Sequence, residues 1–131
     1  MSMEPRFLVV DGYSREGRED LATGGATTAG ELYRKMLAGL CPGCTVDVIY
    51  PADPGVSLPD GTALEQYDGL AWTGSSLTVW KADDPNVRPQ IELMKAAYRH
   101  QVPSFGACWA AQIGAVAAGG RCVAHPHGRE M

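Results

Sequence analysis

Residues 102–120 read VPSFGACWAAQIGAVAAGG. The segment starts apolar and extended, turns at Gly106, Ala107 and Cys108, and continues as an alanine-rich run that ends in a glycine pair. Alanine is the best helix former and glycine commonly follows a helix C-terminus, so the pattern predicts a strand, a tight turn and a helix. The unpaired N–H groups at the start of a helix favour a thiolate over a thiol. We therefore interpret Cys108 as a candidate nucleophile on a sharp strand-to-helix turn, beside backbone donors for an oxyanion.

Three stretches carry a resemblance to a known family. Residues 106–112, GACWAAQ, resemble the nucleophile motif G-x-C-x-G-x-Q of class I glutamine amidotransferases, with Ala110 in place of the second glycine. Residues 67–76, YDGLAWTGSS, resemble the strand and loop that supply part of the oxyanion hole in this family. Residues 119–123 together with 128–131 resemble the segment after the nucleophile helix. Within the family, the chain looks most similar to proteins related to the amidotransferase domain of GMP synthetase.

The resemblance implies a reaction and a set of site residues. A cysteine thiolate attacks the side-chain amide of L-glutamine, passes through an oxyanion to a thioester with loss of ammonia, and water then releases glutamate. The implied residues are Cys108 as catalytic nucleophile, the backbone N–H groups of Gly74, Ser75 and Trp109 as oxyanion donors, and Gln112 as a contact to the substrate. Gln112 is interpreted equally well as a polar residue one turn into a helix, without a role in binding the substrate. No metal and no cofactor are expected.

The base that cysteine chemistry needs is not evident among the three histidines. His100 ends a predicted helix at the opposite end of the sheet from Cys108. His125 and His127 flank a proline and are interpreted as solvated loop residues, since no cysteine or carboxylate cluster supports a metal site there. The family places its His-x-Glu pair further along than this chain extends. We therefore expect residues 1–131 to be a single domain that lacks its C-terminal segment and is nearly inactive alone.

Composition limits the class of protein. A chain of 131 residues, 45% hydrophobic and 20% charged, is typical of one globular domain. Its net charge of −4 argues against nucleic acid or an anionic membrane as partner. No apolar run approaches the ~20 residues of a membrane helix, and the N-terminus lacks a signal-peptide layout. We expect a cytoplasmic protein.

Cys41-Pro42-Gly43-Cys44 has the spacing of a redox motif. It follows a predicted helix and precedes a strand, which is the reverse of a thioredoxin-type site, and a zinc site would need about two more ligands. We interpret it as a Pro-Gly turn. Cys122 lies in an apolar run and is interpreted as a core residue.

Alternating strands and helices predict an α/β fold of three layers, flavodoxin-like, with a mostly parallel sheet and helices on both faces. The expected strands are residues 6–11, 45–50, 67–73, 101–105 and 121–124. The expected helices are residues 29–40, a segment from about 84 to 100, and the run after Cys108. Residues 12–25 and 52–64 are expected to be loops. The 29–40 helix has Leu32, Met36, Leu37 and Leu40 on one face. In such folds ligands lie beyond the carboxyl ends of the strands, where Asp11, Gly12, residues 73–75 and Cys108 would gather.

Three other functions remain open. A γ-glutamyl peptide hydrolase, or another cysteine hydrolase, would use the same turn and the same thiol chemistry. A non-catalytic flavodoxin-like module that binds a nucleotide or flavin is suggested by residues 23–28, TGGATT, at a helix N-terminus. A pseudoenzyme or interaction module fits Ala110 and the missing base. A glutaminase would pass ammonia to an acceptor or a synthetase partner, and an unpaired sheet edge is compatible with a homo-oligomer.

Overall fold

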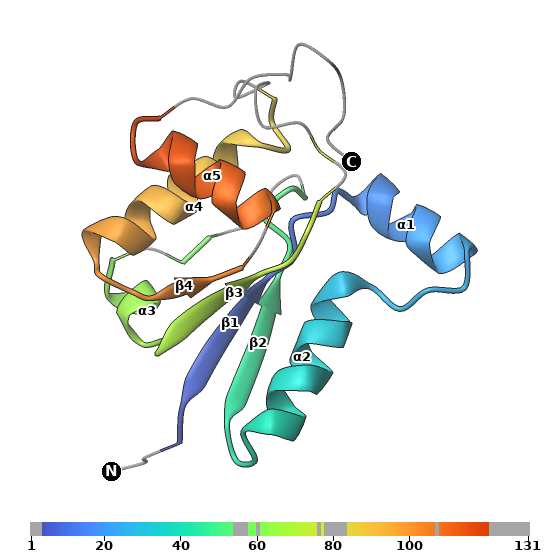
Figure 1. Ribbon diagram of the computed structural model, residues 1–131, viewed down its shortest axis with the longest axis horizontal. Coiled ribbons are helices and arrows are strands. Elements are labelled where there is room, and N and C mark those ends of the chain that lie inside the picture. Colours follow the sequence, from blue (N-terminus) through green and yellow to red (C-terminus); the bar gives the residue numbers. More distant parts are fainter. Residues whose placement is uncertain are drawn as a thin grey trace.

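The computed structural model describes residues 4–53, 58–59, 61–75, 77, 84–106 and 108–120. These residues form a parallel sheet with the strand order β2-β1-β3-β4 (Figure 1). The strands are β1 (Arg6–Val10), β2 (Thr45–Ile49), β3 (Gly69–Trp72) and β4 (Ser104–Phe105). The helices are α1 (Arg15–Thr23), α2 (Ala29–Leu40), α3 (Gly61–Glu65), α4 (Arg88–Arg99) and α5 (Trp109–Ala117).

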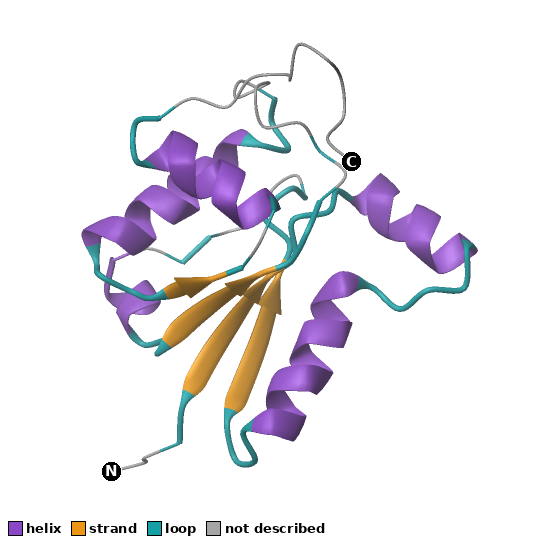
Figure 2. Ribbon diagram, in the orientation of Figure 1, coloured by secondary structure: helices purple, strands orange, loops and turns teal. Residues whose placement is uncertain are grey.

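The helices lie on both faces of the sheet. Figure 2 shows α2 beside one face, and α4 and α5 packed together on the opposite face. The main core lies between the sheet and the α4–α5 pair. Its fully buried members include Leu8, Val10, Leu64, Leu70, Trp72, Val87 and Ile113. The expected three-layer α/β class is confirmed.

Local signals placed several elements correctly. The predicted helix 29–40 is observed with the same bounds, and the side chain of Thr28 accepts a hydrogen bond from the Glu31 N–H at 3.4 Å as its N-cap. β1, β2 and β3 lie within their predicted ranges. The helix expected from about residue 84 begins at Arg88, because residues 84–87 form a turn in which the Asp84 carbonyl accepts from the N–H groups of Val87 and Arg88.

Two predicted loops contain helices. Residues 12–25 include α1, which begins after Ser14, whose side chain accepts from the Gly17 N–H at 3.1 Å. The sequence of α1 is mostly charged and has only Leu21 and Ala22 as aliphatic residues, so it has too few apolar positions to mark a buried helical face, and none of its residues is buried. Residues 52–64 overlap α3, which brings Leu64 into the core.

The apolar face expected on α2 is not buried by the described residues. Leu32, Met36 and Leu40 are 54%, 43% and 76% exposed. The helix instead approaches the sheet at its buried Gly30, where an added Cβ would lie 2.8 Å from Cγ1 of Val48.

Some expectations fall on residues that are not described. The predicted strand 121–124, Cys122, His125 and His127 lie outside the described residues, as do Ala107 and Ser76. Within the described ranges, no helix is both long and apolar enough to cross a membrane, and no group of three or more metal-ligating side chains is found.

Candidate active site

Cys108 occupies the turn between β4 and α5, which we call the elbow. It is the N-cap residue of α5, is exposed, and has φ +55° and ψ −96°. A positive φ is unfavourable for a residue with a Cβ, and strain of this kind, of order 1–3 kcal/mol, clusters at functional sites. The strand-to-helix turn expected from the sequence is therefore present, with its cysteine at the carboxyl end of the sheet.

The close packing of the elbow depends on Gly106. A Cβ added there would lie 2.6 Å from Cβ of Ala110, and 3.1 Å from both Cβ and the carbonyl oxygen of Trp72. The methyl group of Ala110, which replaces the second glycine of the motif, is accommodated because position 106 has no side chain. The elbow thus packs directly against the last residue of β3.

The loops after β1 and β3 meet the elbow helix at Gly12. Its N–H donates to Oγ1 of Thr73 at 2.9 Å, and its carbonyl oxygen accepts from Oγ of Ser75 at 2.8 Å. A Cβ on Gly12 would lie 2.8 Å from Nε1 of Trp109 and 3.0 Å from the carbonyl oxygen of Gly74. The structure therefore brings Gly74, Ser75 and Trp109 to one glycine at the carboxyl end of the sheet. The contacts are made by the Gly74 carbonyl oxygen, the Ser75 hydroxyl and the Trp109 indole, and not by the backbone N–H groups that were predicted as oxyanion donors.

Gln90 of α4 joins these parts and was missed by the sequence reasoning. It is fully buried, its Oε1 accepts from Nε1 of Trp109 at 2.8 Å, and its Nε2 donates to the carbonyl oxygens of Gly12 at 3.2 Å and Asn86 at 3.0 Å. The available signal was a polar residue on the apolar stripe of a predicted helix, one position before Ile91. A buried amide with all these bonds made holds the loop after β1 and the elbow helix in one geometry.

Asp11 is a second buried polar residue beside this loop. Its Oδ1 accepts from the Tyr13 N–H and its Oδ2 accepts from the Gly30 N–H, both at 3.0 Å. Burial raises the pKa of this carboxyl, although both backbone bonds oppose the shift. Because Asp11 and Thr28 already occupy the first N–H groups of α2, this helix start does not offer the free amides of a phosphate site.

Gln112 and His100 occupy different ends of the molecule. Nε2 of Gln112 points to Sγ of Cys108 at 4.0 Å, a long contact one turn into α5. His100 follows α4 and its Nδ1 lies 2.9 Å from Oε1 of Glu65 in α3. Both α3 and the end of α4 precede a strand, so this pair lies at the amino end of the sheet, away from Cys108. It does not serve as the base for the thiol.

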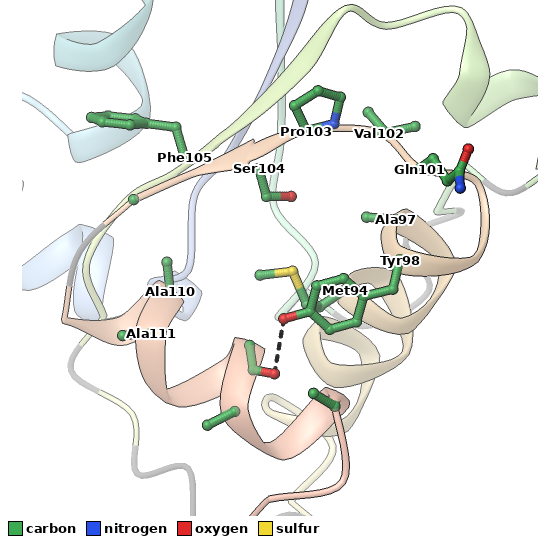
Figure 3. A pocket seen from close by; sticks show the side chains of 14 residues that line it. Met94, Ala97, Tyr98, Gln101, Val102, Pro103, Ser104, Phe105, Ala110 and Ala111 are labelled. Carbon is green, nitrogen blue, oxygen red and sulfur yellow. Dashed lines mark hydrogen bonds between the residues drawn. The ribbon is translucent and has the colours of Figure 1, made fainter.

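A groove of about 690 Å³ runs between β4, α4 and α5 (Figure 3). Ser104 and Phe105 line one side, Ala110 and Ala111 another, and the Tyr98 hydroxyl crosses it to donate to the Gly114 carbonyl at 2.9 Å. Cys108 is not among the described residues that line it. The groove lies along β4, which is an edge strand of the described sheet.

Comparison with known proteins identifies the fold. In its architecture the chain is similar to a solved glutamine amidotransferase. It superposes on a glutamine amidotransferase from Methylobacillus flagellatus with a TM-score of 0.64 and 22% identity, over 95% of this chain and 43% of that one. In sequence it is similar to a gamma-glutamyl-L-1-hydroxyisopropylamide hydrolase from a Pseudomonas species, with 32% identity over 117 residues, which is 88% of this chain and 38% of the hydrolase. The chain thus spans less than half of either relative. No family model matches it.

Proposed function

We propose that this chain carries the cysteine nucleophile of a class I glutamine amidotransferase, which hydrolyses the side-chain amide of L-glutamine and releases ammonia for an acceptor. The observation that supports this most strongly is the backbone of Cys108, an exposed, non-glycine residue held at φ +55° at the start of a helix. Such strain persists only where the surrounding structure imposes it, and a presented nucleophile is a function that requires it.

The arrangement suggests a role for each neighbour. The Cys108 sulfur, as thiolate, attacks the amide carbon, and the resulting oxyanion accepts from the N–H of Trp109 and from an N–H of Gly74 or Ser75. Expulsion of ammonia leaves a thioester, which water cleaves to glutamate. Gln112, with its amide directed at the sulfur, contacts the substrate.

The general base is proposed to come from another part of a longer protein. His100 is the single histidine in the described part of the chain, and it is paired with Glu65 at the other end of the sheet. Both relatives are more than twice as long as the region they share with this chain. We therefore propose that residues 1–131 form one amidotransferase-like domain without its C-terminal segment, and that they turn over glutamine very slowly by themselves. The cytoplasmic location and the ammonia acceptor stay predictions from the sequence.

A second candidate is hydrolysis of an N-substituted γ-glutamyl amide. The name of the Pseudomonas relative favours it, because that protein hydrolyses a γ-glutamyl amide of an amino alcohol. The thioester would be the same, and an amine would leave in place of ammonia. Only the group beyond the scissile bond differs between the two candidates.

The nucleophile can be tested on this chain with iodoacetamide, by peptide mass spectrometry under reducing conditions. Cys41 and Cys44 are half-buried internal reference thiols in the same sample. We expect Cys108 to be alkylated about tenfold faster near neutral pH, and to be protected by L-glutamine but not by L-asparagine. A Cys108 rate equal to those of the reference thiols, with no protection by any γ-glutamyl compound, would refute the assignment.

The same assay separates the two candidate substrates. Protection of Cys108 by N-alkyl γ-glutamyl amides, at concentrations where L-glutamine has no effect, would replace the first candidate by the second. In the whole protein, Cys108→Ala must abolish turnover of the preferred amide; unchanged turnover would exclude Cys108 as nucleophile.

A further inference from the structure

A pair of thiols, separate from Cys108, lies at the opposite end of the sheet from the elbow. Cys41 follows the last turn of α2 and Cys44 precedes β2, so the connection between these elements is Cys-Pro-Gly-Cys (Figure 1, the turn at the bottom of the view that joins α2 to β2). Both cysteines are half-buried and both are reduced. The strands are parallel, so this turn lies at their amino ends and cannot take part in chemistry at Cys108.

The turn has the geometry that a disulfide requires. The N–H of Cys44 donates to the carbonyl oxygen of Cys41 at 3.1 Å, and Gly43 has φ +88° after a proline, which is the signature of a type II β-turn. The ends of a β-turn have Cα atoms less than about 7 Å apart, and disulfides bridge Cα atoms about 4.4–6.8 Å apart. Closing the bond therefore needs little backbone movement.

The thiol of Cys44 is held close to its own turn, because its Sγ donates to the Leu37 carbonyl at 3.7 Å. Burial, and after it the adjoining Cys41, raise the pKa of the Cys44 thiol. Cys44 is thus held as a protonated thiol, and we assign the first step of any exchange to Cys41.

We propose that Cys41 and Cys44 form a reversible disulfide by exchange with a small-molecule disulfide such as oxidised glutathione. The sulfur of Cys41 attacks one sulfur of the reagent, which forms a mixed disulfide and releases one thiol. The sulfur of Cys44 then attacks the Cys41 sulfur, closes the ring and releases the second thiol. The two protein thiols are oxidised, the reagent is reduced, and their two protons end on the two released thiols.

The Cys41–Cys44 pair is a redox site separate from the proposed nucleophile, Cys108. It would join the end of α2 to the start of β2, an edge strand of the described sheet, without a change at the carboxyl end where the elbow lies. The Pro-Gly turn expected from the sequence is thus present. The reversed helix-to-strand order argued against a thioredoxin-type site, whereas the geometry of the turn is the basis for the disulfide proposed here.

The test uses the whole chain in glutathione buffers of increasing oxidised fraction, quenched with acid and mapped by mass spectrometry. We expect the peptide with Cys41 and Cys44 to lose two hydrogen atoms, and the equilibrium constant for closure to be at least several-fold larger than for the same chain unfolded in urea. Cys44→Ser should accumulate glutathione on Cys41, whereas Cys41→Ser should leave Cys44 unmodified under the same conditions. The alkylation rate of Cys108 should not change on oxidation.

Several results would overturn the proposal. Both thiols could stay free in the most oxidised buffer, the mixed disulfide could persist in the unsubstituted chain, or the product could be an intermolecular dimer. Equal closure in the folded and the unfolded chain would show that the turn contributes nothing. None of these outcomes depends on amidase activity, so the test of the redox pair is independent of the proposed function.

Discussion

The contact between Gly106 and Ala110 leads to a quantitative prediction about the elbow. Gly106→Ala adds a methyl group whose carbon would lie 2.6 Å from Cβ of Ala110 and 3.1 Å from Cβ of Trp72. The backbone of Gly106 is not in the left-handed region, so alanine meets a packing clash there and no conformational penalty. The cost of the substitution is therefore a measure of how tightly the elbow packs on β3.

The magnitude follows from the contacts. Overpacking a well-packed site costs about 1–3 kcal/mol. Ala110→Gly alone should cost about 1 kcal/mol of helix propensity and about 0.8 kcal/mol for the loss of a buried methyl group. In the double variant the shortest clash is absent and only the contacts to Trp72 remain. We expect the double variant to be less destabilised than the sum of the two single variants, with a coupling free energy of about 1 kcal/mol or more.

Urea unfolding followed by far-ultraviolet circular dichroism measures each free energy of unfolding. The matched control is Ala111→Gly, the exposed next residue of α5, which loses the same helix propensity without facing Gly106. The changes in the free energy of unfolding caused by Gly106→Ala and by Ala111→Gly should add to within about 0.5 kcal/mol in the double variant. If Ala110→Gly couples to Gly106→Ala no more than the control does, the elbow does not pack as described.

Three further predictions concern the buried polar groups. Gln90→Leu should destabilise the chain by about 2–4 kcal/mol, since it leaves the buried Trp109 indole N–H without its acceptor and takes one donor from each of the carbonyl oxygens of Gly12 and Asn86. Gln90→Met, of similar volume and without an amide, should have a similar cost, and a cost under 1 kcal/mol for either variant would contradict the network. Burial raises the folded-state pKa of Asp11, so its contribution to stability is complete below about pH 4 and is lost as the pH rises through the raised pKa. The stability of the unsubstituted chain relative to Asp11→Asn should therefore fall as the pH rises above about 4 in urea titrations, and a rise would contradict the sign of the shift. In the Arg18–Asp53 ion pair, Nη2 and Oδ2 are 2.7 Å apart and both side chains are about 15% exposed. A double-mutant cycle of Arg18→Met and Asp53→Asn should give a coupling free energy of about 1–3 kcal/mol. Additive costs would show that the pair is not formed.

Much of the fold could be predicted because its signals are local. The alanine run before the glycine pair marks α5, the Thr28 cap marks the start of α2, and a short apolar run marks β1. α1 was missed because its sequence is mostly charged, with only two aliphatic residues, Leu21 and Ala22, to mark an apolar face. The exposed residues of α2 show the opposite case, in which a periodic apolar face is present and the described residues do not cover it.

The polar interior of the candidate site could not be predicted in the same way. Gln90 reaches Gly12 across 78 positions of sequence, and Ser75 reaches it across 63. Periodicity and propensity describe neighbours along the chain and contain no information about such pairs. A polar residue on an apolar helical stripe indicates that a partner exists, without indicating which one.

Local pattern alone specified the α/β alternation, the turn that carries Cys108 and the Pro-Gly turn at residues 41–44, because helix caps, turn residues and apolar periods act over a few residues. Only the folded chain set the positive φ of Cys108, the meeting of Gly12 with the loop after β3, and the hydrogen bond of the Cys44 thiol to the Leu37 carbonyl. These features depend on how separate elements pack, and packing is a property of the whole sheet with its helices.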